Sequence, residues 1–284
     1  MPDNETKYIE KEKRLNKVRF AKAQNEALAK QKRNYIIIMS ILFVIMMCLI
    51  FGICMEMRKY NQNTKSIKEA QQYIGKNKID WEGLQKINPD IIGWIYLPKS
   101  DINYPILKSH DNSEYLSRGY NKKYNVAGSI FTDFRHKEPF ESRNTIVYGH
   151  RMANGSMFHT ITDYKDQKFY DEHDKIYIYT PQKDYIMQVL SFTRVKHNSK
   201  FYNIIEEETN DKAEQNQKIN NLISYINNHN LIRYNAFYHV KETDNFVTLS
   251  TCAQRGLYQN GVREILFGNL IENKDNVFPE INIK

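Results

Sequence analysis

Residues 245–271 read NFVTLSTCAQRGLYQNGVREILFGNLI and hold two of the runs that decide the fold class. The runs 245–251 and 262–271 are rich in β-branched and aromatic residues, a composition typical of strands. Further runs of this kind precede them at 91–98, 102–107, 127–134, 144–149, 175–180, 185–195 and 235–240. At least eight candidate strands at short spacing predict a closed or nearly closed barrel.

Two helical patterns interrupt these runs. One covers 156–164, and the other covers 214–228 with its apolar residues on one face: Ile219, Leu222, Ile223 and Ile226. The polar, acidic stretch 197–213 is expected to be a loop. The predicted fold class is therefore mostly β with helices.

Two more helices are expected ahead of the barrel. Ser66 stands three residues before Glu69, which is the spacing of a capping box. Residues 81–87 predict a short helix that ends before Pro89. Both would lead into the main domain.

A membrane anchor is predicted at 35–55, which reads YIIIMSILFVIMMCLIFGICM without a charge. A helix of about 20 apolar residues spans the hydrocarbon core of a bilayer. The alternative is a cleaved signal peptide, but this run is longer than a usual h-region and no small-x-small cleavage site follows it. An uncleaved anchor fits better.

The basic residues predict the orientation of this anchor. Residues 1–34 carry ten Lys/Arg against five Asp/Glu, which is +5 of the net charge of +8. The positive-inside rule then makes 1–34 a cytoplasmic basic tail, followed by the anchor 35–55, a linker 56–65 and an extracellular domain 66–284. A nucleic-acid-binding domain would usually carry the charge on a folded face, so no nucleic-acid partner is expected.

The cysteines divide between the anchor and the domain. Cys48 and Cys54 lie in the apolar run, where a thiol is a small apolar side chain. Cys252 is the single cysteine after the anchor and has no internal disulfide partner. A lone thiol of this kind is intermolecular, reactive or simply buried. Three cysteines exclude a disulfide-dense scaffold and a four-thiolate zinc site, and no metal or cofactor is predicted.

Three polar residues stand at the ends of apolar runs: His150, Cys252 and Arg263. A thiol must lose its proton before it attacks a carbonyl, and a nearby imidazole or positive charge favours the thiolate. A guanidinium is suited to stabilising the oxyanion that follows. If the strand ends meet, these residues form a working set for acyl transfer.

Several strings together resemble the sortases, membrane-anchored transpeptidases of Gram-positive bacteria. TLSTC at 248–252 with Arg263 eleven residues later is similar to the TLxTC…R signature, and NTIVYGHRM at 144–152 resembles the segment with the catalytic histidine. The class B subgroup is indicated by NPDIIGWIYLP (88–98), AGSIFTDFR (127–135), NGSMF (154–158) and FYDEH (169–173). The resemblance covers roughly residues 66–271.

This resemblance implies an eight-stranded sortase-type β-barrel, with N-terminal helices and an extra helix between the sixth and seventh strands. It makes Cys252 the nucleophile, His150 the acid/base and Arg263 the arginine that binds substrate and oxyanion. The substrate-binding positions that it suggests are Tyr148, Ser250, Thr251, Asn112 and Leu116. Arg255, three residues after the cysteine, is a rival to Arg263, which we prefer because a strand holds it more rigidly.

The implied reaction joins surface proteins to the cell wall. Cys252 would attack the carbonyl at the threonine of an NPxTx-like sorting signal near a protein's C-terminus. His150 would protonate the leaving amine, and an amine of the cell-wall peptide or peptidoglycan precursor would resolve the thioacyl enzyme. The expected partners are thus sorting-signal-bearing surface proteins, the wall precursor and the cytoplasmic membrane.

Other cysteine enzymes of the cell wall and a non-catalytic barrel compete with this interpretation. Papain-like peptidases usually place the cysteine before the histidine, whereas His150 precedes Cys252 here, and the HGC-type motif of L,D-transpeptidases is absent. From a different class, a catalytically silent, membrane-tethered barrel could serve as a binding or scaffold module. Such a module needs no activated cysteine.

Overall fold

The computed structural model describes residues 4–75, 78–199, 201–202, 211–229, 232–241, 244–252, 261–274, 279 and 281. For Cys252 it describes the backbone alone. The chain divides into two compact units, Met1–Arg58 and Lys59–Lys284. The first belongs to helix α1 (Asn4–Gln71), which runs on into the second unit.

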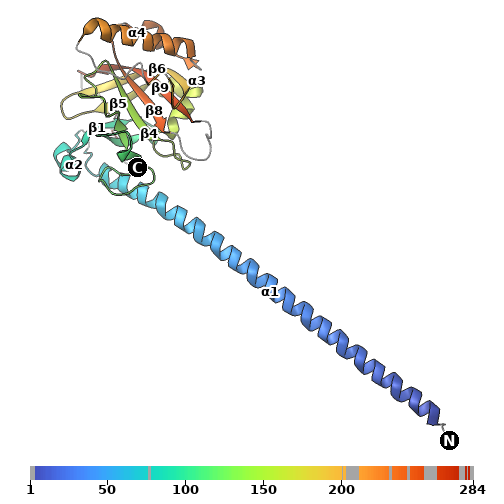
Figure 1. Cartoon of the computed structure of the whole chain (residues 1–284). Coiled ribbons are helices and arrows are strands. Elements are labelled where there is room, and N and C mark those ends of the chain that lie inside the picture. Colours follow the sequence, from blue (N-terminus) through green and yellow to red (C-terminus); the bar gives the residue numbers. More distant parts are fainter. Residues whose placement is uncertain are drawn as a thin grey trace. The chain divides into compact units, whose positions relative to one another are not determined.

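Eight strands of the second unit close into a barrel (Figure 1). The order is β5-β1-β2-β3-β4-β8-β9-β6-β7, and β5 also pairs with β6, so that the ring closes and leaves β7 outside it. β2 pairs with β3 and β4 with β8 in parallel, and the other pairs are antiparallel. The strands are β1 (Ile91–Tyr96), β2 (Asn103–Lys108), β3 (Ile130–Thr132), β4 (Asn144–His150), β5 (Lys175–Tyr179), β6 (Asp184–Lys196), β7 (Ile232–Arg233), β8 (Asn245–Cys252) and β9 (Val262–Glu272). The predicted eight-stranded barrel is confirmed.

Both faces of the central strands are buried. Ile146 and Val147 are neighbours on β4, yet they belong to two different hydrophobic clusters, and Phe246 and Val247 on β8 divide in the same way. Successive side chains of a strand point to opposite faces, so each strand serves an inner and an outer core. This explains why these strands read as continuous apolar runs rather than as alternating ones.

Helices cover the barrel and connect its strands. The predicted helix at 81–87 is α2 (Trp81–Ile87), and the Asp80 carboxylate caps it by accepting a hydrogen bond from the Gly83 N–H at 2.9 Å. The helix predicted at 214–228 is α4 (Lys212–His229), whose Ile219, Leu222 and Ile226 are buried. The remaining helices are η1 (Glu114–Leu116), η2 (His159–Lys165), α3 (Gln167–Glu172) and η3 (Asn235–His239). The patch predicted at 156–164 is therefore a 3₁₀-helix that starts later.

The strand predicted at 235–240 is wrong, since this segment forms η3, a 3₁₀-helix. Its Phe237 N–H donates to the Tyr234 carbonyl at 2.9 Å, and the Phe237 side chain is buried. The neighbouring strands offer this β-rich segment no free edge with which it could pair. β4 and β9 flank β8 on both sides, and β6 uses its remaining edge for the two residues of β7.

The helix start predicted at Ser66 is also wrong. α1 continues through 56–65 to Gln71, because no glycine or proline lies between residues 53 and 74 to interrupt it. Ser66 therefore caps no helix start. The boundary between linker and domain stays a prediction.

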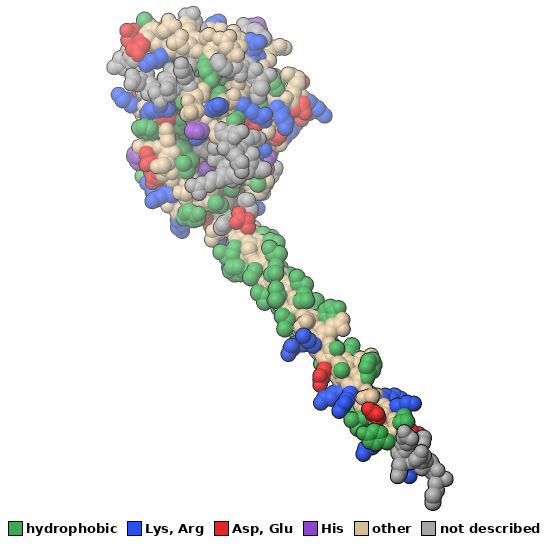
Figure 2. All heavy atoms as spheres, turned by 45° about the vertical axis from the view of Figure 1, so that its right-hand side comes forward, with side chains coloured by type: hydrophobic (Ala, Val, Ile, Leu, Met, Phe, Trp, Pro, Cys, Tyr) green, Lys and Arg blue, Asp and Glu red, His purple; other side chains and the backbone are tan. Residues whose placement is uncertain are grey.

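Within the described residues, one helix is long and apolar enough to cross a membrane. Its most apolar 18-residue window has a mean hydropathy of 3.1 and buries nothing within the protein. Figure 2 shows hydrophobic side chains around this part of α1 and Lys and Arg side chains toward its N-terminal end. Length and composition thus agree with the anchor predicted at 35–55.

Candidate active site

The strand register brings the backbones of the three predicted catalytic residues together. In the parallel β4–β8 pair, His150 lies opposite Cys252, and Tyr148 lies opposite Ser250. β8 and β9 pair antiparallel as far as Ser250 opposite Ile265, so two further residues in the same register set Arg263 opposite Cys252. Register partners point to the same face of a sheet. The three residues thus share one face at one end of three neighbouring strands.

The His150 ring is half-buried and is held by a backbone group. Its Nε2 lies 2.7 Å from the Leu116 carbonyl oxygen, which can only accept, so Nε2 carries a proton. Nδ1 is buried and has no hydrogen-bond partner among the described residues. Burial lowers the pKa of His150, the Leu116 carbonyl opposes this, and the charge of Arg263 lowers it further. The neutral imidazole is therefore the resting form at neutral pH, with its lone pair on Nδ1.

The Arg263 guanidinium lies against two tyrosine rings. Its central carbon is 6.0 Å from the ring centroid of Tyr148 and 5.9 Å from that of Tyr202. These contacts orient a planar cation through the negative ring faces. The buried Nε of Arg263 has no hydrogen-bond partner among the described residues. A donor in this state is suited to an anionic group on a substrate.

Tyr148 and Ser250 lie on this face, two residues before His150 and Cys252 on β4 and β8. Ser250 is fully buried, and its hydroxyl lies 2.8 Å from that of Tyr202. The Tyr148 hydroxyl donates to Asp133 Oδ2 at 2.9 Å. Since both hydroxyls are engaged, the two side chains orient the ring of Tyr202 and the loop after β3. Contact with a substrate stays a prediction for both.

Thr251 turns to the opposite face of β8. Its hydroxyl accepts the Glu264 N–H at 2.9 Å. Glu264 is buried as well, and its carboxylate accepts hydrogen bonds from Thr162 at 2.6 Å and from Arg194 at 2.9 Å. Thr251 is thus separated from Cys252 by the strand and joins a polar cluster beneath the site.

The two loop residues predicted to meet the substrate have structural partners. Asn112 donates to Asp133 Oδ2 at 3.1 Å and accepts from the Phe134 N–H at 3.1 Å, so it ties its loop to the end of β3. Leu116 contributes its backbone carbonyl to His150. Leu116 therefore contacts His150 through its main chain. A contact of its side chain with substrate stays a prediction.

Sequence reasoning missed three residues of this region: Tyr202, Asp133 and Glu264. Tyr202 falls in the stretch 197–213 that was predicted as a loop, where no pattern marks one tyrosine above another. Asp133 lies in the quoted string AGSIFTDFR, and Glu264 follows Arg263 directly, so both could have been singled out as charges inside strand-like runs. Arg255, the rival of Arg263, lies outside the described residues.

No group of three His, Cys, Asp or Glu side chains that could hold a metal ion occurs in the part of the chain that the structure describes.

Comparisons with known proteins agree with this fold. A family model described as the sortase domain matches residues 95–270. The chain is 34% identical over 199 residues to sortase B of Listeria monocytogenes, covering 69% of this chain and 76% of that protein. It is 30% identical over 240 residues to sortase B of Staphylococcus aureus, covering 78% and 90%.

Solved structures give the same result. Sortase B from B. anthracis in complex with AAEK1 has a TM-score of 0.63 at 30% identity, covering 76% of this chain and 100% of that one. A Staphylococcus aureus sortase B–substrate complex has a TM-score of 0.60 at 28% identity, covering 76% and 94%. The chain therefore belongs to the sortase family, a family of cysteine transpeptidases that anchor surface proteins. Its relatives make it class B-like.

The Asp133 carboxylate generates a prediction about acid stability. Burial by itself raises the pKa of Asp133, but the hydrogen bonds and charge of Arg135 outweigh it and hold the pKa below its ordinary 3.8. A depressed pKa adds stability above the unfolded pKa that is lost as the pH falls through the folded one. The free energy of unfolding of the parent protein should therefore exceed that of Asp133→Asn by a constant amount above about pH 4. This difference should decrease below that pH.

Asp184→Asn is the matched control with the opposite sign. Burial raises the pKa of Asp184, so its ionisation weakens the folded state as the pH rises, and the parent should lose stability relative to this variant. Urea unfolding followed by tryptophan fluorescence at a series of pH values measures both. The same pH dependence in the two variants would contradict the assignment of Asp133.

Proposed function

We propose that this chain is a cysteine transpeptidase that uses Cys252, His150 and Arg263 to transfer surface proteins from a sorting signal to the cell wall. The observation that carries the proposal is the register that pairs His150 with Cys252. The β8–β9 register, continued by two residues beyond Ser250 and Ile265, would set Arg263 beside them. Membership of the sortase family supports the reaction class. The residue roles rest on the chemistry of the three side chains.

The first half of the reaction forms a thioacyl enzyme. Cys252 Sγ attacks the carbonyl carbon at the threonine of the signal while its proton moves to the Nδ1 lone pair of His150. The carbon–nitrogen bond then breaks, and the leaving amine takes that proton from Nδ1. A sulfur–carbon bond has formed, an amide bond has broken, and His150 is neutral again.

The second half reverses these steps with another amine. The amine of a cell-wall peptide attacks the thioacyl carbon and gives its proton to His150. The sulfur–carbon bond breaks, and Cys252 recovers a proton. Arg263 stabilises the oxyanion of both tetrahedral intermediates through its free donors.

The sorting signal is of the NPxTx type, by likeness to class B sortases. Tyr148, Ser250 and Thr251 support the groove that receives it, and Asn112 and Leu116 border it. The anchor 35–55 keeps the domain near the membrane, where the emerging surface protein and the lipid-linked wall precursor both occur. The alternative, a silent binding barrel, needs neither a reactive thiol nor the lone pair on Nδ1.

Orientation has its own test. The basic tail places the N-terminus in the cytoplasm and the domain outside. A reporter that is active only in the cytoplasm should therefore be inactive when fused to the C-terminus. Strong reporter activity would reverse the orientation.

Thiol reactivity tests the pairing of Cys252 with His150. In the full chain carrying Cys48→Ala and Cys54→Ala, Cys252 is the only thiol. Its alkylation rate against pH should change when His150→Ala is added, because the imidazole takes the thiol proton. A thioacyl adduct with an NPxTx peptide, seen by mass spectrometry and absent in Cys252→Ala, completes the test.

His159→Ala is the control for this measurement, since the His159 Nδ1 also lies 2.7 Å from a backbone carbonyl, that of Met152. It should leave the alkylation profile unchanged. An alkylation profile of Cys252 that changes in neither histidine variant, together with no thioacyl adduct, would favour the silent barrel.

The two candidate arginines are separated by a paired substitution. Arg263→Ala should lower the rate of peptide cleavage by roughly 100-fold or more, as expected on losing an oxyanion donor. Arg255→Ala should leave most of the rate. Measured turnover with the opposite order would transfer the role to Arg255.

A further inference from the structure

The Leu116 carbonyl is the only group within the described residues that holds the ring of His150 by a hydrogen bond. This inference rests on the proposed function, in which His150 is the acid/base. A neutral imidazole carries one proton, and the hydrogen bond made by one nitrogen decides which nitrogen carries it. The position of the Leu116 carbonyl therefore sets the tautomer of His150.

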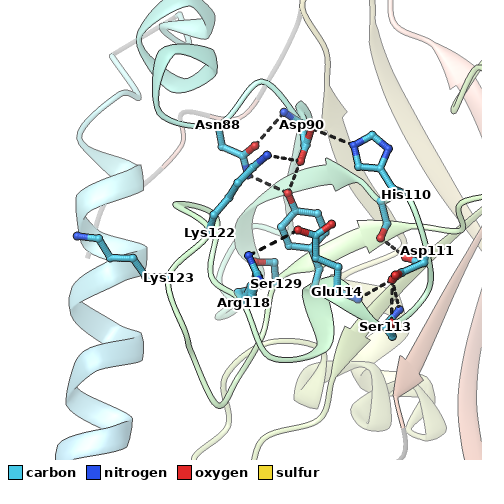
Figure 3. A network of polar contacts seen from close by, with 12 residues as sticks. Asn88, Asp90, His110, Asp111, Ser113, Glu114, Arg118, Lys122, Lys123 and Ser129 are labelled. Atoms are coloured by element: carbon cyan, nitrogen blue, oxygen red, sulfur yellow. Dashed lines mark hydrogen bonds and ion pairs between the residues drawn. The ribbon is translucent and has the colours of Figure 1, made fainter.

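The residue before Leu116, Tyr115, is anchored at three points, and its partners Asn88, Asp90 and Ser129 are labelled in Figure 3. Tyr115 is fully buried, its hydroxyl donates to Asp90 Oδ2 at 2.5 Å, and it accepts from Asn88 Nδ2 at 3.0 Å. The Tyr115 carbonyl accepts the Ser129 N–H at 2.9 Å. Lys122 Nζ lies 2.9 Å from Asp90 Oδ2 and helps to fix that carboxylate. Ring, hydroxyl and carbonyl of Tyr115 thus hold the peptide that leads into Leu116.

The backbone of Gly128 packs closely against the carbonyl groups of Tyr115 and Leu116. A Cβ atom at residue 128 would lie 2.4 Å from the Tyr115 carbonyl oxygen and 2.8 Å from the Leu116 carbonyl oxygen. Gly128 also has a φ of +59°, which glycine adopts without strain. No other residue allows both the turn and this close approach.

The start of η1 is fixed independently. Asp111 Oδ1 accepts the N–H groups of Ser113 and Glu114, each at 2.7 Å. Because η1 has only three residues and is fixed at both ends, the carbonyl of its last residue, Leu116, has little freedom to move.

The geometry points to Asp90, Tyr115 and Gly128 as positioning residues that aim the Leu116 carbonyl at His150 Nε2. They keep the imidazole proton on Nε2 and so leave the lone pair of Nδ1 for the Cys252 thiol. With the carbonyl displaced, the proton exchanges between the two nitrogens, and part of the enzyme holds the wrong tautomer. Such a displacement lowers turnover by the fraction of enzyme that holds the wrong tautomer.

Nitrogen NMR of the His150 ring tests this directly. The full chain is prepared in detergent micelles with ¹⁵N-labelled histidine, and His150→Ala identifies the signals of that ring. The parent should show the Nε2-protonated tautomer. Gly128→Ala and Tyr115→Phe should both show a mixture of tautomers, with the larger change in Gly128→Ala.

Tyr185→Phe is the matched control. The Tyr185 hydroxyl also donates to a carboxylate, Glu141, at 3.0 Å, and that carboxylate is also paired with a lysine, Lys183. Tyr185 pairs with Glu272, ten residues along β6 from the Val195–Arg263 pair, or roughly 30 Å away. This variant should keep the parent tautomer.

Cleavage of a fluorogenic NPxTx peptide gives the second readout. We expect kcat to fall about 100-fold in Gly128→Ala and about 3- to 10-fold in Tyr115→Phe, in the same order as the loss of the parent tautomer. If Gly128→Ala does not fold, Tyr115→Phe carries the test alone. Parent-like tautomers in every folded variant would overturn the inference. Full cleavage by His150→Ala would instead overturn the proposed function and leave the tautomer result standing.

Discussion

The parallel pairing of β4 with β8 is the constraint on which the rest of this structure depends. A parallel pair cannot be closed by a hairpin, so the chain must return through a long connection. Here that connection contains β5, β6, α4 and β7, and it closes the barrel on its way. The entropy of closing a long loop grows only slowly with its length, and burial on both faces of the strands offsets it. Residues about a hundred positions apart in the sequence therefore become neighbours on a rigid base.

The same pairing divides the polar residues between two faces of the sheet. Tyr148 and His150 on β4 share a face with Ser250 on β8, whereas Thr251 lies on the other face with Glu264. Each face has a buried carboxylate that is neutralised locally: Asp133 by Arg135, and Glu264 by Arg194. Arg263 has no such carboxylate partner among the described ion pairs. A guanidinium in this state would suit the role of oxyanion donor proposed for Arg263.

The sequence predicts the barrel well because its strands carry their own signal. Continuous β-rich runs mark β1, β4, β6, β8 and β9 to within two residues, since most of their residues are aromatic, β-branched or otherwise apolar. The run at 235–240 carries the same signal but forms η3, because pairing depends on an open edge and not on composition alone. Of the site, His150, Cys252 and Arg263 could be read from their positions at run ends. Tyr202 and the Leu116 carbonyl could not, because one comes from a loop without pattern and the other is a main-chain group.

The state of His150 decides which form of acyl-transfer chemistry the site favours. An imidazolium–thiolate pair at rest would need a histidine that holds its proton at neutral pH. Burial and the nearby charge of Arg263 act against this by lowering the pKa of His150. The Leu116 carbonyl fixes the single proton on Nε2 and leaves Nδ1 as the base. In the proposed reaction, the imidazole gains its charge as the sulfur attacks the substrate carbonyl. In the proposed reaction, Arg263 would oppose the imidazolium but stabilise the oxyanion created in the same step, so its net effect would depend on the substrate being in place.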